Sequence, residues 1–530
     1  RLLTPAELLA RLQGPWMLSA DGLRDVSARQ KTLRGAIRWS YDLLSPAEQT
    51  LLMRLAVFVD GCTLEAAEAV CGEETSSPVA PWHEMQPAAL QVFDGIASLL
   101  DKSLLHRETG RSGESRYVLF ETVREFAMEQ FVAAAEESQA RNRHLAWCLS
   151  LAATAVPSPF SILEQTGWKQ IDAEIHNLRA GLAWAFQSDA AAALRLVPAI
   201  SRTLANRGFV REARTWIDRG LALTEAADAT VDRAALLYGK GIAEFLADDP
   251  DAAEPSMVDL LTLSRQLNLI LGQAGAKYYL GRLASMTGDA QRAEALLESA
   301  AGDFLEAGEI IDWGHVISIL AEIAMFRGDL QRSRSLHMQA VTRKLPPDQR
   351  HQVFWSVGGL AELAHLEGDL AEAERLAKEC LALCLHRDNP GEIAWPLTCL
   401  GEIATRRGDF AAARTYLDEA LALGKQADSY WRIAIVQADL ADLAVAEGKP
   451  VEAFGWYRAS LPVMLQRGIF AYPPGSLRLA FLAGAVNQHE VAATLLAACS
   501  AAVEDGIEVF LSITLTQSDF DRALAATKAA

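Results

Sequence analysis

Apolar residues recur at intervals of three and four through the second half of the chain, which is the spacing of amphipathic helices. The pattern breaks at regular points, as in the stretches "MFRGDLQRSRSLH", "HLEGDLAEAERLA" and "TRRGDFAAARTYL". Each break lies forty residues after the previous one, at Gly208, Asp248, Gly288, Gly328, Gly368, Gly408, Gly448 and Gln488. Eight positions in constant register indicate a repeat architecture.

Each break predicts the turn between two antiparallel helices. Glycine adopts positive φ at low cost and so ends a helix, and the acidic residues that follow, such as Asp369, can cap the next one. Small residues stand five positions after the breaks, at Ala213, Ala253, Ala293, Ser333, Ala373, Ala413, Ala453 and Ala493. In the central repeats, the matching small residues of the first helix are Gly281, Ala321, Ala361, Gly401 and Ala441. Such helix pairs bury their apolar faces only by stacking on one another.

The pattern of residues 31–130 differs from that of the repeats. An amphipathic segment over residues 32–58 comes first, and within it Ser45 and Glu48 form a capping-box signature. A second, short helix is predicted over residues 63–71, with Thr63 as its cap. A third helix is predicted over residues 91–103. The stretches "SLLHRE" and "SRYVLF" then flank "TGRSGE", which predicts a β-hairpin. Three helices followed by a hairpin are the order of a winged helix.

Several stretches carry a resemblance to a known family. "WSYDLL", "LLDKSLL" and "YVLFETVREFAMEQF" together resemble the bacterial signal-transduction ATPases of the STAND class, the AfsR/MalT-like regulators related to NB-ARC proteins. "DAEIHNLRAGLAWAF" is similar to the helix that connects the winged helix to the repeat sensor in that family, and "RLLTPAELLARL" resembles the end of its helical lid. The repeats over roughly 191–506 resemble tetratricopeptide units, lengthened from the usual period of about 34 residues.

The resemblance implies an all-α fold with a fixed order of parts. We expect a lid remnant over 1–30, a winged-helix domain with a small β-hairpin over 31–130, and a helical connector over 131–190. A right-handed α-solenoid of about eight tetratricopeptide-like helix pairs follows over 191–513, with a C-terminal tail over 514–530. Because the chain begins at Arg1 within helix-like sequence, we expect it to be part of a longer protein whose nucleotide-binding domain lies upstream.

Nucleotide chemistry is expected in the parent protein and not in this chain. No G-x-x-x-x-G-K-[ST] motif occurs, so we expect ATP or ADP in the parent and no cofactor here. The Met-His-Asp motif with which NB-ARC proteins sense a nucleotide phosphate matches Leu119, Phe120 and Glu121. Phe120 cannot donate a hydrogen bond, and we interpret it as a core residue. The ten histidines are isolated and no catalytic motif occurs, so we expect no enzyme and no catalytic or metal site in this chain.

Charge and cysteine content narrow the partners and the compartment. The net charge of −19 disfavours nucleic acid and anionic membranes, and no apolar run is long enough to span a bilayer. Residues 1–130 contain 13 Lys and Arg against 18 Asp and Glu, so direct DNA binding by the winged helix is not expected. Seven scattered cysteines predict a reduced, cytoplasmic protein. Cys380, Cys384 and Cys399 are interpreted as buried helix contacts in preference to a metal site.

Two further features recur with the forty-residue period. The small first-helix residues are followed directly by a charged residue, at Arg282, Glu322, Glu362, Glu402 and Asp442. Trp355 and Trp395 each lie seven positions before one of the glutamates. In tetratricopeptide-like stacks this register faces the inner side, so we hypothesise a partner-binding site of Trp355, Glu362, Trp395, Glu402, Glu322 and Asp442. An acidic column beside indoles suits a basic or amphipathic peptide or a cationic ligand. The alternative is a solvated charge column with the indoles packing between repeats.

The expected function is that of the regulatory, sensor half of a cytosolic STAND-type signalling ATPase or transcriptional regulator. A protein, peptide or small effector would bind the solenoid, and the winged helix would relay this to the upstream nucleotide-binding domain in cis, with self-association on activation. Two alternatives remain open. In the first, the chain is a DNA-binding transcription activator that uses its winged helix. In the second, it is a stand-alone scaffold for protein–protein interaction.

Overall fold

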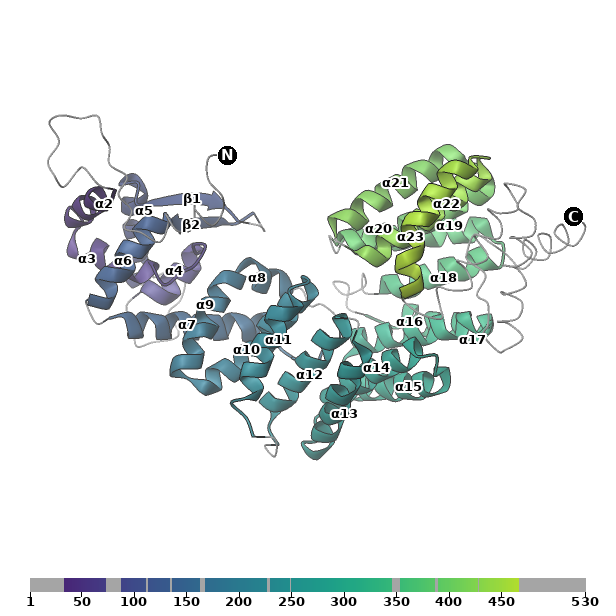
Figure 1. The fold of residues 1–530 in the computed structure, drawn as a ribbon, viewed down its shortest axis with the longest axis horizontal. Helices are drawn as coiled ribbons and strands as arrows, with labels where there is room; N and C mark the ends of the chain where they lie inside the picture. Colours follow the sequence, from purple (N-terminus) through teal and green to yellow (C-terminus); the bar gives the residue numbers. More distant parts are fainter. Residues whose placement is uncertain are drawn as a thin grey trace, which may run out of the picture. The chain divides into compact units, whose positions relative to one another are not determined.

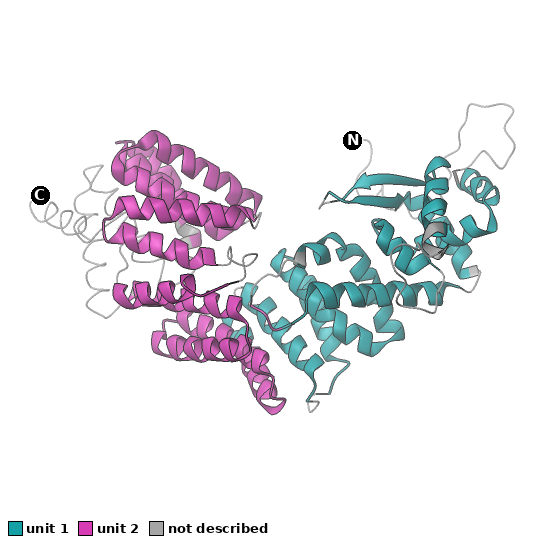
Figure 2. Ribbon diagram, turned by 180° about the vertical axis from the view of Figure 1, so that it is seen from behind, with its two compact units in different colours: residues 1–159, 164–253 teal, residues 160–163, 254–530 magenta. Residues whose placement is uncertain are grey.

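The computed structural model describes residues 33–72, 87–110, 113–133, 136–162, 167–225, 229–247, 249–345, 353–386, 389–427 and 429–466. The expected lid remnant (1–30) and tail (514–530), and the repeat positions Asp248, Gln488 and Ala493, lie outside these residues. The chain forms two compact units, residues 1–159 with 164–253 and residues 160–163 with 254–530 (Figure 2).

The first part of unit 1 is a small helical domain with one hairpin (Figure 1). Its helices are α2 (Leu33–Asp42), α3 (Pro46–Leu55), α4 (Leu64–Cys71), α5 (Pro87–Asp101) and α6 (Glu121–Ala133). The strands β1 (Leu105–Thr109) and β2 (Ser115–Leu119) pair antiparallel, with Leu105 opposite Leu119. Leu52, Leu99 and Phe131 are almost completely buried in the core between these elements. Helix order and hairpin match the winged helix predicted from the sequence.

Local signals set the boundaries of these helices. The Ser45 side chain accepts a hydrogen bond from the Glu48 N–H, and the Ser45 N–H donates to the Glu48 carboxylate at 2.8 Å, which completes the predicted capping box. Thr63 caps α4 by accepting from the Ala66 N–H at 3.2 Å. Both predicted caps are thus confirmed. Such caps can be predicted from sequence because a hydroxyl pairs with free helix N–H groups of the same turn.

A helical segment continues unit 1 beyond the winged helix. It comprises α7 (Glu137–Ala155), α8 (Trp168–Ala173) and α9 (Ile175–Ser188), and then α10 (Ala190–Asn206), α11 (Val210–Leu221) and α12 (Val231–Leu246). Helix α7 packs on α4 and on α9, and α9 packs on α10. One buried cluster, which includes Cys148, Leu178, Leu182, Leu196 and Ile217, therefore joins the connector to the first helix pair.

Unit 2 is a succession of helix pairs joined by short turns (Figure 1). After α13 (Pro250–Gln266) the pairs are α14 (Ile270–Met286) with α15 (Ala290–Glu306), α16 (Ile310–Phe326) with α17 (Leu330–Val341), α18 (Phe354–Leu366) with α19 (Leu370–Leu385), α20 (Pro390–Arg407) with α21 (Phe410–Gln426), and α22 (Tyr430–Ala446) with α23 (Pro450–Gln466). Each pair packs within itself and on the next. The predicted stacked helix pairs are thus confirmed.

The turn within each pair has the predicted chemistry. Gly208, Gly288, Gly328, Gly368, Gly408 and Gly448 all have positive φ, between 75° and 84°. The Asp369 side chain then accepts a hydrogen bond from the Glu372 N–H at 3.1 Å, and Asp289, Asp329 and Asp409 cap their helices in the same way. Glycine is required here because a Cβ atom makes this backbone conformation costly.

Small residues bring the two helices of a pair into close contact. The alanine or serine five positions after each described break is fully buried, as at Ala293 and Ala413. On the first helix, a Cβ atom added to Gly401 would lie 2.6 Å from Leu417 Cγ, and one added to Gly281 would lie 2.8 Å from Leu297 Cγ. The leucine of the second helix therefore occupies the space that the glycine leaves open.

Replacing Gly368 by Ala is expected to lower the free energy of unfolding by about 1–2 kcal/mol, because φ is +84° and no atom lies within 4 Å of the new Cβ, so the cost is backbone strain alone. Thermal or urea unfolding followed by circular dichroism measures this change. Gly302→Ala is the matched control, since Gly302 is exposed within α15 with equally open surroundings. That change should raise the stability by about 0.5–1 kcal/mol, and two substitutions with the same sign would contradict the turn assignment.

Candidate functional site

The six residues of the hypothesised partner site lie on the first helices of successive pairs. Glu322 is on α16, Trp355 and Glu362 are on α18, Trp395 and Glu402 are on α20, and Asp442 is on α22. Five of them are half-buried, whereas Glu402 is only 5% exposed. The structure therefore places the predicted residues in one register of neighbouring helices, and their role in binding a partner stays a prediction.

The two tryptophans lie close together and one of them contacts the acidic column. The Trp355 and Trp395 ring centroids are 5.3 Å apart, and Trp395 Nε1 donates a hydrogen bond to Glu362 Oε1 at 2.8 Å. The Trp395 ring also lies against Gly358, where an added Cβ would come within 2.3 Å of it. Trp395 thus packs between repeats, as the alternative interpretation expected, and at the same time orients Glu362.

The carboxylates are only partly solvated, so the column is less exposed than the alternative interpretation expected. Glu402 is buried, Glu362 accepts from an indole, and Asp442 accepts from the Tyr457 hydroxyl. The physical reason is the narrow spacing of stacked first helices, which covers side chains that a single amphipathic helix would expose. Reversing the charge of Glu362 or Glu402 would therefore disturb packing as well as any ligand contact.

The aromatic series extends beyond the predicted residues. His315 on α16 stacks edge to face with Trp355, with ring centroids 5.5 Å apart, and its Nε2 lies 3.2 Å from the Tyr278 hydroxyl. Arg282 donates from Nη1 to the same hydroxyl at 2.9 Å. His315 stands forty residues before Trp355, so the period could have revealed it. Tyr278 has no such signal, because the corresponding positions of the next repeats are not aromatic.

A fifth helix, α22, carries Arg432, whose positive charge acts on members of the same group of residues. Burial lowers the pKa of its guanidinium, while nearby groups that include Glu362 and Glu322 act in the opposite direction. We call Tyr278, Arg282, His315, Glu322, Trp355, Glu362, Trp395 and Arg432 the first-helix cluster. Sequence reasoning missed Arg432, because no repeat position or local spacing relates it to Glu322 and Glu362.

The first-helix cluster holds its acids in a poorly hydrated environment. Burial raises the pKa of Glu322 to about 7, with the nearby Glu362 as a further cause. Burial likewise raises the pKa of Glu362 to about 7, against the opposing effects of the Trp395 hydrogen bond and of Arg432. Perturbed carboxylates beside arginines and aromatic rings are typical of functional sites, although structural networks also produce them.

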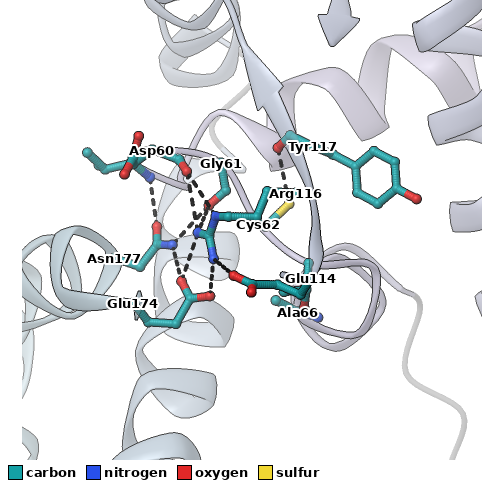
Figure 3. A network of polar contacts seen from close by, with 11 residues as sticks. Asp60, Gly61, Cys62, Ala66, Glu114, Arg116, Tyr117, Glu174 and Asn177 are labelled. Carbon is teal, nitrogen blue, oxygen red and sulfur yellow. Dashed lines mark hydrogen bonds and ion pairs between the residues drawn. The ribbon is translucent and has the colours of Figure 1, made fainter. Parts of the chain in front are cut away.

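A second network joins the winged helix to the connector within unit 1 (Figure 3). Arg116 on β2 donates to both carboxylate oxygens of Glu174, at 2.5 and 3.1 Å, and to the Gly61 carbonyl at 3.0 Å. Asn177 Nδ2 donates to the same Gly61 carbonyl at 3.0 Å and to Glu174 Oε2 at 2.7 Å. Its Oδ1 atom accepts from the Val59 N–H at 2.7 Å.

This Arg116–Glu174–Asn177 network is buried, since all three residues are at most 7% exposed. Glu174 and Asn177 stand at the start of α9, in the stretch that resembles the connector of the family, but the sequence assigned them no role. No periodic signal links a strand arginine to a helix that begins 59 residues later, at Ile175. The tertiary structure alone shows that the hairpin and the connector share one polar core.

The winged helix itself has few groups that could contact DNA. Helix α5 contains no Lys or Arg, and the Lys102 that follows it pairs with Glu48 at 2.5 Å. The hairpin arginine Arg116 is buried in the network with Glu174. Phosphate contacts require accessible basic groups, and on α5 and the hairpin the described residues offer only Lys102, which pairs with Glu48, and the exposed Arg107 of β1.

Phe120 is not the core residue that the sequence suggested. It is 49% exposed, and its ring stacks on His106 with centroids 4.5 Å apart. Its neighbour Leu119 is buried, as alternation along the strand requires. The prediction was wrong because "YVLF" is apolar at every position, so its pattern does not distinguish the two faces of the strand.

Cysteines and histidines form no metal site in the described ranges. All six cysteines in these ranges are unbridged and buried, including Cys380, Cys384 and Cys399, as expected for helix contacts. No group of three His, Cys, Asp or Glu side chains there could hold a metal ion. Within the same ranges, every helix is too short or too polar to cross a membrane.

Two family models match the chain. A winged helix-turn-helix domain matches residues 44–131, and a MalT-like TPR region matches residues 275–506. A relative from Mycobacterium tuberculosis (strain ATCC 25618 / H37Rv), provisionally named an HTH-type transcriptional regulator, is 30% identical over 315 residues, which are 58% of this chain and 33% of the relative. An uncharacterized protein of Mycobacterium bovis is 32% identical over 134 residues, which are 25% of this chain and 31% of that protein.

The chain spans about a third of the length of these curated relatives. Among solved structures, a STAND protein with a tetratricopeptide repeat sensor from Pyrococcus horikoshii is 14% identical, with a TM-score of 0.46 over 84% of this chain and 67% of that chain. The first matched region extends from α3 into α6 and includes the hairpin, and the second extends from α14 through the helix pairs of unit 2. The chain therefore contains a winged helix-turn-helix domain followed by a MalT-like tetratricopeptide region, the two parts that the resemblance to the MalT-like regulators implied.

Proposed function

We propose that this chain is the sensor and relay portion of a bacterial STAND-type signalling ATPase or transcriptional regulator. An effector binds the first helices of the tetratricopeptide region, and the connector and the winged helix pass the bound state to a nucleotide-binding domain elsewhere in the parent protein. ATP or ADP belongs to that domain, and this chain is itself no enzyme. The parent acts in the cytoplasm, and activation involves self-association.

The observation that carries the relay proposal is the Arg116–Glu174–Asn177 network. It fixes the hairpin of the winged helix to the start of α9 through buried, charge-assisted hydrogen bonds. Helix α9 packs on α10, the first helix of the repeat region. A contiguous series of packed elements is a physical route for coupling, provided that the effector has different affinities for two states.

The main alternative function is DNA binding by the winged helix. It is favoured by the name given to the mycobacterial relative, and it is opposed by the acidic charge and by the absence of basic residues from α5. A second alternative, a scaffold without an ATPase partner, has no specific observation in its favour.

A titration of fluorescent duplex DNA with the full 530-residue chain distinguishes these functions. We expect no binding at low salt beyond weak, sequence-independent association, because few accessible arginines or lysines face one groove. A winged helix that binds DNA would instead give an affinity that falls steeply with salt, by roughly three to five orders of magnitude between low and moderate salt for six to ten phosphate contacts. A steep dependence of this kind would contradict the relay proposal.

A further inference from the structure

A short loop between α7 and α8 is buried in unit 2. Residues 160–163 belong to that unit, although the residues on both sides of them in the chain belong to unit 1 (Figure 2). Phe160, Ser161 and Ile162 are only 4%, 5% and 8% exposed, and they lie in neither a helix nor a strand. Loops normally run over the surface, because their backbone groups need hydrogen-bond partners. The burial of this loop, which we call the 160–162 segment, therefore requires a partner that binds polypeptide.

The partner of the segment is Asp312, in the first turn of α16. Its Oδ1 atom accepts a hydrogen bond from the Ser161 hydroxyl at 3.3 Å, and its Oδ2 atom accepts one from the Ile162 N–H at 3.4 Å. Asp312 is itself only 2% exposed, and a buried carboxylate is costly unless donors satisfy it. One of these two donors is a main-chain N–H, which every residue of a peptide except proline carries. The carboxylate therefore recognises features that a separate peptide also offers.

The sequence keeps the segment out of a helix. Pro157 and Pro159 lack a backbone N–H, and each disfavours helical backbone at the residue before it, so α7 cannot continue through them. No hydrogen-bond ladder of a helix or a strand holds residues 160–162. Two buried apolar side chains and two hydrogen bonds to one carboxylate are instead the contacts of a bound peptide.

The place of the segment adjoins the first-helix cluster. Asp312 and His315 are three positions apart on α16, so they lie on the same face of this helix. The His315 ring in turn contacts the Trp355 ring, with centroids 5.5 Å apart. The segment is therefore bound on the helix face that also carries the aromatic series.

We propose that the 160–162 segment is a built-in ligand of the repeat region, and that an extended peptide with the same order of side chains, apolar–hydroxyl–apolar, competes with it for Asp312. This inference rests on the proposed sensor function, of which it names the effector class and the regulation. Without effector the segment occupies the site, and a bound peptide displaces it and frees the loop between α7 and α8. Because the segment is tethered, it acts at a roughly millimolar effective concentration, which sets the affinity that a competing peptide needs.

The test measures binding of a fluorescent peptide with the sequence of residues 156–163, VPSPFSIL, to the full chain. We expect weak binding to the unmodified chain, because its own segment occupies the site. Phe160→Ala combined with Ser161→Ala removes the buried ring and the hydroxyl donor of that segment. The peptide should bind this emptied variant at least about tenfold more tightly, because the competitor in the chain is weakened. A segment that is only a fixed part of the fold gives no such gain.

Substitutions on both sides of the contact show where the peptide binds. In the emptied variant, Asp312→Asn should weaken peptide binding about ten- to a hundredfold, the effect of losing a charged acceptor. A peptide that is N-methylated at the nitrogen matching Ile162 should lose a similar factor, and a scrambled peptide should not bind. Glu306→Gln is the matched control, since Glu306 is exposed at the end of α15, and it should change nothing.

Limited proteolysis of the unmodified chain keeps the proposal testable if a variant fails to fold. Chymotrypsin cleaves after aromatic residues, and the burial of Phe160 protects this bond until the segment opens. Millimolar peptide should speed cleavage after Phe160 severalfold, whereas the scrambled peptide should leave the rate unchanged. Unchanged cleavage with the native peptide, or equal peptide affinity of the emptied and unmodified chains, would overturn the inference.

The failure of this inference and the failure of the sensor function are distinguishable. An effector that binds the repeats without changing cleavage after Phe160 would remove the built-in ligand and leave the sensor function intact. A peptide that displaces the segment without changing hydrogen exchange at residues 59–62 and 174–177 would support the peptide site and contradict the relay.

Discussion

Replacing Glu174 by Ala is expected to lower the free energy of unfolding of unit 1 by about 3–5 kcal/mol. The substitution removes the carboxylate that Arg116 contacts at 2.5 Å and leaves a guanidinium in a site where Arg116 is only 7% exposed. It also removes the acceptor of Asn177 at 2.7 Å. Chemical unfolding followed by circular dichroism measures this loss of stability. The loss is expected in the transition of unit 1, because the winged helix and the connector both belong to that unit.

The control for this substitution is Glu137→Ala. Glu137 pairs with Arg141 at 2.7 Å within one helix, with both side chains partly in solvent, and such pairs contribute about 0.3–0.5 kcal/mol. A loss at Glu174 no larger than the loss at Glu137 would mean that the network does not hold the winged helix to the connector. Arg116→Met combined with Glu174→Leu should recover part of the stability, because the pair is then removed as a whole.

The same substitutions separate sensing from relay in the parent protein. Glu174→Ala should leave ligand affinity at the first-helix cluster unchanged, because Glu174 belongs to unit 1 and the cluster to unit 2. It should weaken the response of the parent to that ligand if the connector carries the coupling. Equal loss of affinity and response would point to global unfolding of the chain as the cause.

Gly358→Ala is expected to destabilise unit 2 by about 1–3 kcal/mol through overpacking. An added Cβ would lie 2.3 Å from the Trp395 ring, and both backbones are held in packed helices, so neither side can yield freely. The change should also disturb the Trp395 hydrogen bond to Glu362 and hence alter the tryptophan fluorescence of the native state. Thermal unfolding and emission spectra of the same samples measure the two effects.

Gly314→Ala is the control for the change at Gly358. Gly314 lies in α16, and a Cβ there would meet no atom within 4 Å, so the substitution should stabilise by roughly 0.5–1 kcal/mol. If Gly358→Ala is equally harmless, Trp395 can reorient, and its contact with Glu362 is not a fixed part of the cluster.

The sequence by itself determined the elements whose causes are local. The forty-residue period located the turns, and the positive φ of Gly368 with the cap at Asp369 followed from two neighbouring residues. The capping box at Ser45 and the β1–β2 hairpin were predictable for the same reason. A regular repeat also determined that the helix pairs stack, because each pair exposes an apolar face that only its neighbours can cover.

Tertiary structure alone decided which polar groups meet. Arg116 and Glu174 are 58 residues apart, and the Tyr278 hydroxyl meets His315 from 37 residues away, at distances along the chain that no local rule connects. The same holds for Phe120, whose exposure depends on which face of the hairpin is covered. Periodicity specifies which side of each helix is apolar, whereas the position of a charge relative to another depends on how the stacked helices are rotated and curved, which is a property of the packed molecule.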